Sequence, residues 1–397
     1  MGSRLALPVR SSNALTARWT TTFADDDAVV SGAGLWPLLA ILAGAAHGPA
    51  REELAAAVGV SAGTAHAAGL ELLRVFDSSP AVAAAIGAWI RPGSAFRDDW
   101  VRAMPPGSTG TLTDQAALDA WAREHTGGLI ERFPVPIGPS TLFALATALV
   151  ARTRWVTPFT EVTYAPETGP WQGHQGPGLC RRTGPDGSVA VLGDTVTRVI
   201  VTGTDDLDVH LLIGPDPGTA LDAGLAALDD AIPVRTDLAV GTTAPGLTVT
   251  RRKTRGRGDS VEVQLPPFEV NDDHDLTRHA PLFGLVTALR SASGHFPGLS
   301  DQPLAVSDAR QRVLARFDAA GFEAAAVTAM SLRAGSAPVE QWSTITSVTV
   351  ERPFGFLAVH RGSGLVLVAG QVTRPATGWV RSAGADPAPG RFPGRPR

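Results

Sequence analysis

ERPFGFLAVHRGSGLVLVAGQVTRP, residues 351–375, contains two β-rich runs separated by a short turn. The first run is GFLAVH at 355–360, the turn is RGSG at 361–364, and the second run is LVLVAGQV at 365–372. Two such runs around a glycine-containing turn predict an antiparallel hairpin. We therefore expect paired strands near the end of the chain.

The rest of the chain mixes helical and strand patterns. Helices are expected at 34–46, 49–58, 114–126, 219–230 and 275–289, and strands at 207–213, 261–265, 313–317 and 345–350. The apolar run at 141–150 fits either a strand or a helix. Regular strand–helix alternation is missing and no linker divides the chain, so the pattern favours one large α+β domain.

Composition excludes several classes of protein. The 397 residues carry a formal net charge of −4, which gives no reason to expect a nucleic-acid partner. The basic run at 251–257 reads as a solvated loop. The single cysteine, Cys180, excludes an intrachain disulfide and cysteine-based zinc sites. No long apolar run predicts a membrane span, and no signal peptide is visible, which favours a cytoplasmic protein.

No catalytic constellation emerges from the remaining motifs. Ser61 lies in a G-x-S-x-G match at 59–63, but a nucleophile elbow needs a preceding strand, and a helix is expected there. His274 and His279 are five residues apart and read as a solvated helix start. His210 reads as a satisfied core histidine. We therefore expect no catalytic residue, no metal site and no cofactor.

An alanine-rich segment stands out at 319–329, which reads AAGFEAAAVTA. It opens a stretch from Gly321 to Pro353, 33 residues, with little apolar periodicity. Loops of that length are uncommon in compact domains and are usually functional or disordered. Alanine is the best helix former, so a helix is one interpretation. The other is a strand of small side chains that can enter a packed sheet.

Five blocks, in order, resemble the serpin family, in its bacterial type. The family's helix block G-A-x-G-x-T-x-x-E-L resembles residues 29–59, and its N-x-W-V-x-x-x-T-x-G-x-I block resembles 119–133. Its L-V-N-A-x-Y-F-K-G-x-W-x-x-P-F and V-x-x-x-L-P-x-F-x-I blocks resemble 145–159 and 261–270, and its closing block D-R-P-F-x-F-x-I-x-H-x-x-T-G resembles 351–375. The matching stretches are VVSGAGLWPLLAILAGAAHGPAREELAAAVG, DAWAREHTGGLIERF, LATALVARTRWVTPF, VEVQLPPFEV and ERPFGFLAVHRGSGLVLVAGQVTRP.

This resemblance implies a fold, a domain plan and an activity. The fold has three β-sheets, eight or nine helices and an exposed reactive-centre loop. The domain spans 1–375, with the loop at about 319–350 and a disordered tail at 376–397. Inhibitory members are monomeric, metastable suicide substrates of serine proteases. The protease forms an acyl-enzyme with the loop, and the cut loop inserts into the main sheet.

The hinge of the loop matches the family pattern E-E-G-T-E-A-A-A-A-T in part. Ala319 and Ala320 replace the two acids before the glycine, and Phe322 replaces the small hydroxyl residue after it. A strand alternates faces, so insertion would bury Phe322, and fitting its ring costs about 1–3 kcal/mol. The hinge residues are Gly321, Phe322, Glu323, Ala324, Ala325, Ala326, Val327 and Thr328.

Two further sets of residues follow from the same resemblance. Counting from the hinge glycine places the scissile bond at Gly335-Ser336, whereas Arg333-Ala334 suits trypsin-like proteases better because a guanidinium group pairs with an aspartate in the specificity pocket. Leu332 or Met330 would suit chymotrypsin- or subtilisin-like enzymes. The sheet-opening region comprises Ser31, Gly34, Thr147 and Gln311, of which the last three depart from the family pattern.

Three functions remain open at this stage. The first is serpin-like inhibition of a serine protease, without membrane or nucleic-acid partners and without enzymatic activity. The alternative is a non-inhibitory serpin-fold protein that binds or chaperones another protein, because Phe322 and the altered sheet-opening residues hinder insertion. The third, a hydrolase built on Ser61, carries little weight. Family inhibitors are often secreted, so an extracellular location also stays open.

Overall fold

The computed structural model describes residues 6–126, 128, 131–133, 135–138, 141–255, 258–290, 294–306, 309–322 and 340–379. Its helices are α1 Leu7–Thr20, α2 Gly32–Ala45, α3 Gly48–Val58, α4 Ala62–Asp77, α5 Asp98–Ala103, α6 Gln115–Thr126, α7 Pro217–Leu228 and α8 Ala280–Phe283, with the 3-10 helix η1 Leu276–His279. In this described part of the chain, no helix has the length and apolar character that crossing a membrane requires.

The strands form a seven-stranded and a six-stranded sheet away from the helical end. The larger sheet has the order β1-β20-β19-β10-β9-β8-β11, from Ala28–Val30, Leu365–Val372, Phe354–His360, Leu207–Ile213, Val196–Thr202, Val189–Leu192 and Val234–Arg235. The other has the order β12-β13-β18-β14-β7-β6, from Thr243–Ala244, Leu247–Arg255, Glu340–Thr349, Ser260–Leu265, Gly176–Thr183 and Thr160–Tyr164.

Two smaller sheets are the halves of one divided sheet. One has the order β15-β16-β17-β5, from Phe268–Asp275, Arg310–Phe317, Gly321–Phe322 and Thr153–Arg154. The other has the order β3-β2-β4, from Thr109–Thr111, Val82–Ile90 and Phe143–Ala151. Because β5 follows β4 after one residue, the two halves are joined at one end. Counting them together gives the three sheets that the family resemblance implies.

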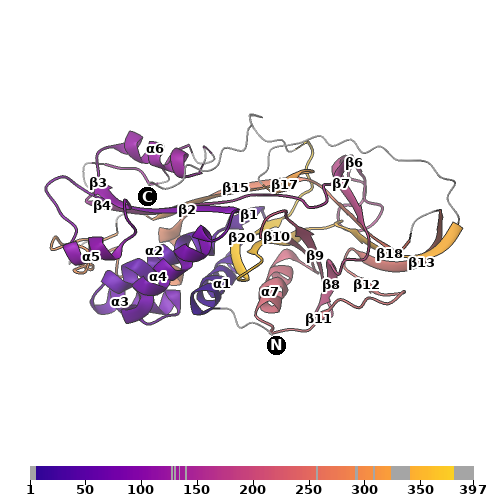
Figure 1. Ribbon diagram of the computed structural model, residues 1–397, viewed down its shortest axis with the longest axis horizontal. Helices are drawn as coiled ribbons and strands as arrows, with labels where there is room; N and C mark the ends of the chain where they lie inside the picture. The colour runs from indigo at the N-terminus through magenta and orange to yellow at the C-terminus, as the bar shows by residue number, and fades with distance from the viewer. Residues whose placement is uncertain are drawn as a thin grey trace.

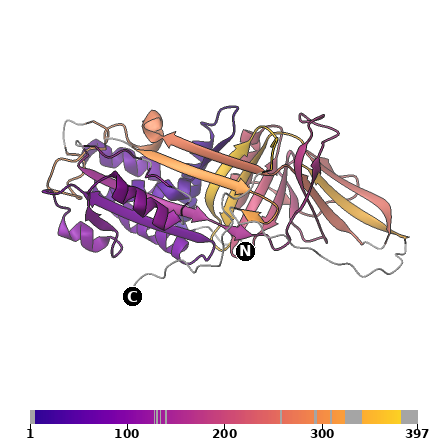
Figure 2. The same cartoon turned by 90° about the horizontal axis from the view of Figure 1, so that it is seen from above.

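Helices cover both faces of the β2–β4 half. Figure 1 shows α6 on one side of this half and α2 and α4 on the other, and the contacts of α6 and α2 with β4 agree. The helices α1 and α7 pack on the seven-stranded sheet. Figure 2, seen from above, shows β13 and β18 extending to the end of the molecule that lies away from the helices. The main core is continuous from α2 to the β19–β20 hairpin.

Most predicted elements are confirmed, and two are wrong. The ambiguous run at 141–150 is strand β4, and the hairpin is β19–β20. The helix expected at 275–289 is only η1 and α8, because Gly284 ends it at a φ of 67°, where an added Cβ would lie 2.4 Å from the carbonyl oxygen of Glu53. The basic run is no loop: residues 251–255 belong to β13, because they pair with β18.

Candidate functional site: the hinge and the divided sheet

The hinge begins at a tight turn where the chain reverses after β16. The Asp318 carboxylate accepts hydrogen bonds from the backbone N–H groups of Ala320, at 2.8 Å, and Gly321, at 3.0 Å. The backbone N–H of Asp318 also donates to the carbonyl oxygen of Gly321. An aspartate that binds the backbone two and three residues further on stabilises such a turn. The turn therefore brings Gly321 and Phe322 back alongside β16.

The first two hinge residues already form a strand. Gly321 and Phe322 make up β17, which pairs antiparallel with β16 on one side and with β5 on the other. Phe322 stands opposite Phe317 and Thr153, and its side chain is 1% exposed. The expected steric cost of burying this ring does not arise here, because the sheet already contains it.

Trp155 and Phe159 hold the other side of the turn. The indole N–H of Trp155 donates to the carbonyl oxygen of Asp318 at 2.9 Å, and its backbone N–H donates to Ala320. The backbone N–H of Phe159 donates to Ala319. Burial raises the pKa of the Asp318 carboxyl group, although the two backbone N–H donors oppose the shift. Backbone groups of the turn thus form hydrogen bonds both with Asp318 and with the segment that contains Trp155 and Phe159.

A cavity of about 90 Å³ runs between β4 and β16, below the hinge strand. No backbone ladder joins these two strands in the described part of the chain. Phe322 lines the cavity, as do residues 145–151 of β4, residues 310–314 of β16, and Ser31 and Gly34 beneath them. The divided sheet therefore has a gap that continues the line of β17.

The four predicted sheet-opening residues meet at this cavity. Gln311 bonds both backbone groups of Ser31: its Oε1 accepts from the N–H at 3.0 Å, and its Nε2 donates to the carbonyl oxygen at 2.8 Å. The hydroxyl group of Ser31 donates to the carbonyl oxygen of Leu367 and accepts from the N–H of Gly34. Thr147 donates to the carbonyl oxygen of Gly34. The altered residues thus form a connected cluster of their own.

His274 belongs to this region, and the sequence analysis missed it. It lies in strand β15, directly opposite Gln311, rather than at a helix start. Its Nε2 is 2.7 Å from the carbonyl oxygen of Val29, and its ring meets Trp19 edge-on at 5.2 Å. The acidic residues at 272, 273 and 275 made the segment look like an exposed helix start rather than a strand. Alternation of Phe268, Val270 and His274 on one face could have revealed it.

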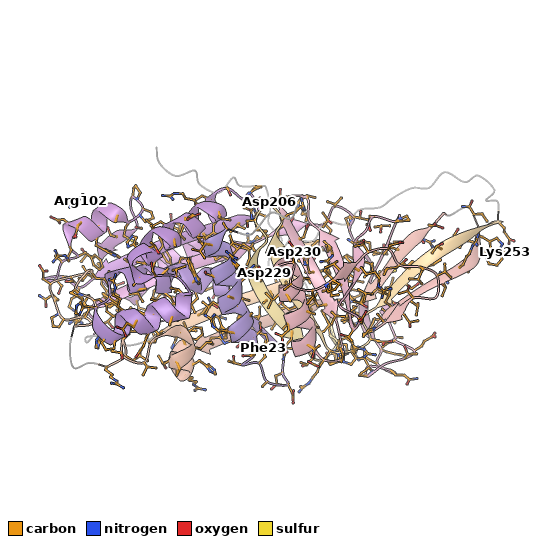
Figure 3. The ribbon with its side chains drawn as sticks, turned by 90° about the horizontal axis from the view of Figure 1, so that it is seen from below. Phe23, Arg102, Asp206, Asp229, Asp230 and Lys253 are labelled. Carbon is orange, nitrogen blue, oxygen red and sulfur yellow. The ribbon has the colours of Figure 1, made fainter. Side chains whose placement is uncertain are left out.

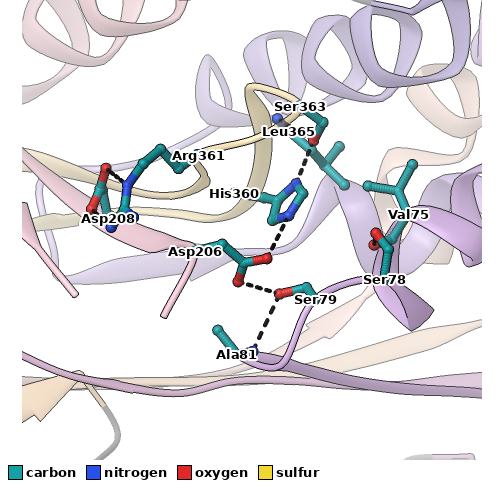
Figure 4. A network of polar contacts seen from close by, with 10 residues as sticks. All are labelled: Val75, Ser78, Ser79, Ala81, Asp206, Asp208, His360, Arg361, Ser363 and Leu365. Atoms are coloured by element: carbon teal, nitrogen blue, oxygen red, sulfur yellow. Dashed lines mark hydrogen bonds and ion pairs between the residues drawn. The ribbon is translucent and has the colours of Figure 1, made fainter. Parts of the chain in front are cut away.

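A second polar network ties the start of β2 to the β19–β20 turn (Figure 4). Asp206 accepts a hydrogen bond from the hydroxyl group of Ser79 at 2.6 Å, and its other carboxylate oxygen lies 3.0 Å from Nε2 of His360. Nδ1 of His360 lies 2.7 Å from the hydroxyl oxygen of Ser363. Beside it, Arg361 binds both carboxylate oxygens of Asp208. This network anchors one end of the half-sheet that borders the cavity.

The rest of the predicted loop lies outside the described residues. This holds for hinge residues Glu323, Ala324, Ala325, Ala326, Val327 and Thr328, and for Arg333, Ala334, Gly335 and Ser336 at the candidate scissile bonds. The C-terminal part of the range assigned to the loop is strand, since β18 begins at Glu340.

Enzymatic chemistry gains no support from Ser61. Its hydroxyl group pairs with that of Thr64 at 2.8 Å at the start of α4, directly after helix α3, so the strand of a nucleophile elbow is missing. Within the described residues, no group of three or more His, Cys, Asp or Glu side chains could hold a metal ion.

Comparison with known sequences identifies relatives. The model of the family Serpin (serine protease inhibitor) matches residues 238–375. Plasminogen activator inhibitor 1 of pig is 26% identical over 265 residues, which cover 65% of this chain and 61% of that protein; the cattle protein is 34% identical over 26% of its length. A putative serpin-Z6C of rice is 26% identical over 382 residues, 87% of each chain. These relatives are animal and plant proteins, so the bacterial type is not supported.

Solved structures show the same architecture. A serpin from the trematode Schistosoma haematobium aligns with a TM-score of 0.68 and 13% identity, over 94% of this chain and 100% of that one. A cleaved Serpin 42Da aligns with a TM-score of 0.68 and 14% identity, over 93% and 98%. These structural alignments show that the chain has the serpin fold, and the serpin family model matches its part from residue 238 to residue 375.

Proposed function

We propose that the protein inhibits a serine protease by loop cleavage, acyl-enzyme trapping and insertion of the hinge strand into the divided sheet. One observation carries the proposal: Gly321 and Phe322 are paired between β16 and β5, at the end of a cavity that separates β16 from β4. The hinge has started along the path that full insertion would follow.

The two ladders predict the register of the inserted strand. Phe322 faces Phe317 on one side and Thr153 on the other. Antiparallel pairing moves one residue forward as its partner moves one back, so Ala324 would face Ala315 and Ala151, and Thr328 would face Gln311 and Thr147. Continued in this register, both ladders would bring Thr328 between two of the residues predicted to open the sheet.

The side chains of the hinge suit this path. Residues 322, 324, 326 and 328 would share the face that Phe322 already buries. After Phe322 these are alanine, alanine and threonine, which are small enough for a narrow cavity. A full new strand would pair on both edges and satisfy backbone groups that β4 and β16 leave without a ladder.

Chemically, the protease supplies the catalytic groups and this chain supplies the substrate. The protease serine attacks a loop carbonyl, the peptide bond breaks, and the new C-terminus stays attached as an ester. Insertion then competes with hydrolysis of that ester. If insertion is faster, the protease stays trapped. If hydrolysis is faster, the loop is an ordinary substrate.

The test combines a denaturing gel, mass spectrometry and thermal unfolding after mixing with trypsin, chymotrypsin or subtilisin. Inhibition predicts an adduct that survives boiling and a cleaved form with a higher Tm. Ala324→Arg would place a charged side chain on the buried face and abolish the adduct. Ala325→Arg, on the opposite face, is the matched control and should retain it. Cleavage by all three proteases without an adduct would overturn the proposal.

The same experiment locates the scissile bond. A released peptide that begins at Ser336 would identify Gly335-Ser336, and one that begins at Ala334 would identify Arg333-Ala334. The second result would favour a trypsin-like target, because the protease pocket would bind the guanidinium group. The protein would act as a monomer in either case, and its compartment stays a prediction.

A non-inhibitory binding protein is the second candidate, favoured by the double hold of Gln311 on Ser31. That contact ties β16 to the start of α2 and would resist further opening. This candidate predicts clean cleavage between Met330 and Ser336, no adduct and no rise in Tm. Phe322→Thr then tests what prevents insertion. An adduct in this variant would mean that the Phe322 ring in the hinge, rather than the Gln311 contact, prevents it.

A further inference from the structure

Strands β13 and β18, which pair with each other, share an exposed basic and aromatic face. Arg251 and Lys253 both lie near the ring of Trp342 of β18, with the guanidinium carbon 5.9 Å and the ammonium nitrogen 5.7 Å from the centre of the indole ring. The Trp342 side chain is 57% exposed. We call these three residues the β13 face.

The charges of this face are unpaired. In the part of the chain that the structure describes, no carboxylate forms an ion pair with Arg251 or Lys253. The neighbouring Arg252 points to the opposite face, where it pairs with Glu262 at 3.3 Å, and Glu262 also binds Arg182. One face of the strand thus has a cation with a carboxylate partner. The other has two cations beside an aromatic ring, and neither forms an ion pair within the described residues.

Protection of a sheet edge explains only part of this arrangement. β12 pairs with β13 at residues 247 and 248 alone, so the stretch from Arg251 to Arg255 is an edge, and lysine and arginine on an edge discourage aggregation. An exposed tryptophan does the opposite, because it adds apolar surface there. Tryptophan, tyrosine and arginine are enriched among the interface residues that contribute most to protein–protein binding.

The β13 face lies within reach of a protease attached to the loop. Trp342 is six residues after Ser336, and an extended chain spans at most about 3.6 Å per residue, so the two are at most about 22 Å apart along the chain. A standard protein interface buries about 800 Å² per partner, a patch of roughly 16 Å radius. A protease that attacks at 333–336 would therefore have its rim close to this face.

We propose that Arg251, Lys253 and Trp342 form a secondary binding surface that selects serine proteases with an acidic rim beside their active site. The inference rests on the proposed function, because it needs a protease to attack the loop. It does not need the protease to be trapped afterwards. Charge complementarity favours an acidic partner, because no carboxylate of the described part of the chain pairs with the two cations. The aromatic ring would supply the apolar contact.

The test measures the second-order rate constant of loop attack, whether an adduct or a cleaved chain results. Lys253→Glu is compared with Arg102→Glu, which makes the same change in net charge. Arg102 is exposed on α5, and Figure 3 shows it at the end of the molecule opposite Lys253. Trp342→Ala tests the apolar contact. The Tm of each variant before mixing shows that it is folded.

We expect Lys253→Glu to slow attack by an acidic-rimmed protease about threefold or more at low salt, and Arg102→Glu to leave it unchanged. The difference should vanish at 1 M salt, where the screening length is about 3 Å. Trp342→Ala should slow attack about fivefold at either salt concentration. A protease whose rim carboxylates are replaced by amides should not distinguish Lys253→Glu from the unaltered protein.

Two results would overturn the inference. Equal rates for Lys253→Glu and Arg102→Glu with every protease would reduce the face to edge protection. Loss of binding to dextran sulfate in Lys253→Glu, with unchanged loop attack, would mean that the face binds a polyanion instead. If the unaltered protein is attacked at the expected rate but forms no adduct, the proposed trapping is wrong. The proposed binding surface is not contradicted by that result.

Discussion

Phe322 lies directly opposite Phe317 in the ladder that joins β17 to β16, and both side chains are buried. Phe317 packs on Trp155 at 4.7 Å and on Phe268 at 5.2 Å between ring centres. The first side chain after the hinge glycine therefore sits beside an aromatic cluster that is part of the main core. The ring that replaces a small residue holds the hinge in the sheet.

Phe322→Ala should release the hinge. Replacing a buried phenylalanine with alanine costs about 3–5 kcal/mol, here felt locally as separation of β17 from its neighbours. Amide hydrogen exchange at residues 320–322 should speed up by two orders of magnitude or more, since about 1.4 kcal/mol is tenfold. Phe322→Leu keeps most of the apolar volume and should change exchange much less. Unchanged exchange in the alanine variant would show that the ring does not anchor the hinge.

Asp318→Ala should open the turn that precedes β17. The carboxylate accepts two backbone hydrogen bonds, and bonds to a charged group contribute about 1.5–3 kcal/mol each. Limited proteolysis at residues 318–321 should become faster, and the Tm should fall. Asp318→Asn retains an acceptor oxygen of the same shape and is the matched control. If both variants behave alike, the charge rather than the acceptor geometry holds the turn.

Asp206→Asn should weaken the network in Figure 4 in a pH-dependent way. Partial burial disfavours the charged carboxyl group, but hydrogen bonds from Ser79 and His360 outweigh it and hold the pKa of Asp206 below its usual range. A lowered pKa means that the stabilisation is present above the usual carboxyl pKa and is lost as the pH falls through the lowered value.

The difference in free energy of unfolding between the parent and Asp206→Asn should thus be about 1–2 kcal/mol at pH 7 and shrink as the pH falls below the usual carboxyl range and through the lowered pKa of Asp206. Urea unfolding across this range measures it. A difference that stayed constant with pH would mean that the amide acts through shape alone.

His210 should make the protein acid-sensitive at a higher pH. Burial lowers the pKa of His210 to about 4. The positive charge of Arg198 adds to this shift, and the negative charge of Asp208 opposes it. The unfolded chain takes up the proton near pH 6.5, so stability is full above that pH and falls between about 6.5 and 4.

His210→Leu should remove about 2–3 kcal/mol of the stability difference between pH 7 and pH 4.5. Nδ1 of His210 has no hydrogen-bond partner among the described residues, so replacing the ring leaves no described partner of Nδ1 without its hydrogen bond. Urea midpoints at the two pH values test this. An equal shift in both proteins would mean that other groups dominate the acid response.

Helices and strands were predicted well from the sequence where the apolar periodicity agrees with residues that cap or end an element. Asp114 caps α6 by accepting from Ala117 at 2.9 Å, and Gly59 ends α3 at a φ of 69°, both as the pattern predicts. The expected helix at 275–289 failed because its break depends on the close approach of Glu53, more than 200 residues away. The sequence does not display such contacts.

The site shows the same limit. The motif positions led to Ser31, Thr147 and Gln311, which do meet. Asp318 was overlooked, although an aspartate three residues before a glycine is typical of a turn. His210 was expected to be a satisfied core residue; it is buried, but Nδ1 lacks a partner in the described structure. Which polar atoms find partners depends on packing between strands, which the residue order does not reveal.

The pairing of β1 with β20 joins residues 28–30 to residues 369–371. Synthesis proceeds from the N-terminus at about 5–20 residues per second, so β1 emerges about 20–70 s before its partner exists. β19, which lies next to β20 in the sheet, is also made at the end. Two adjacent strands of this seven-stranded sheet, β20 and β19, are thus made late, and a chain interrupted at residue 350 would lack both of them. The newborn protein therefore spends most of its synthesis with an apolar strand uncovered, which is when a chaperone or a degradative enzyme would meet it.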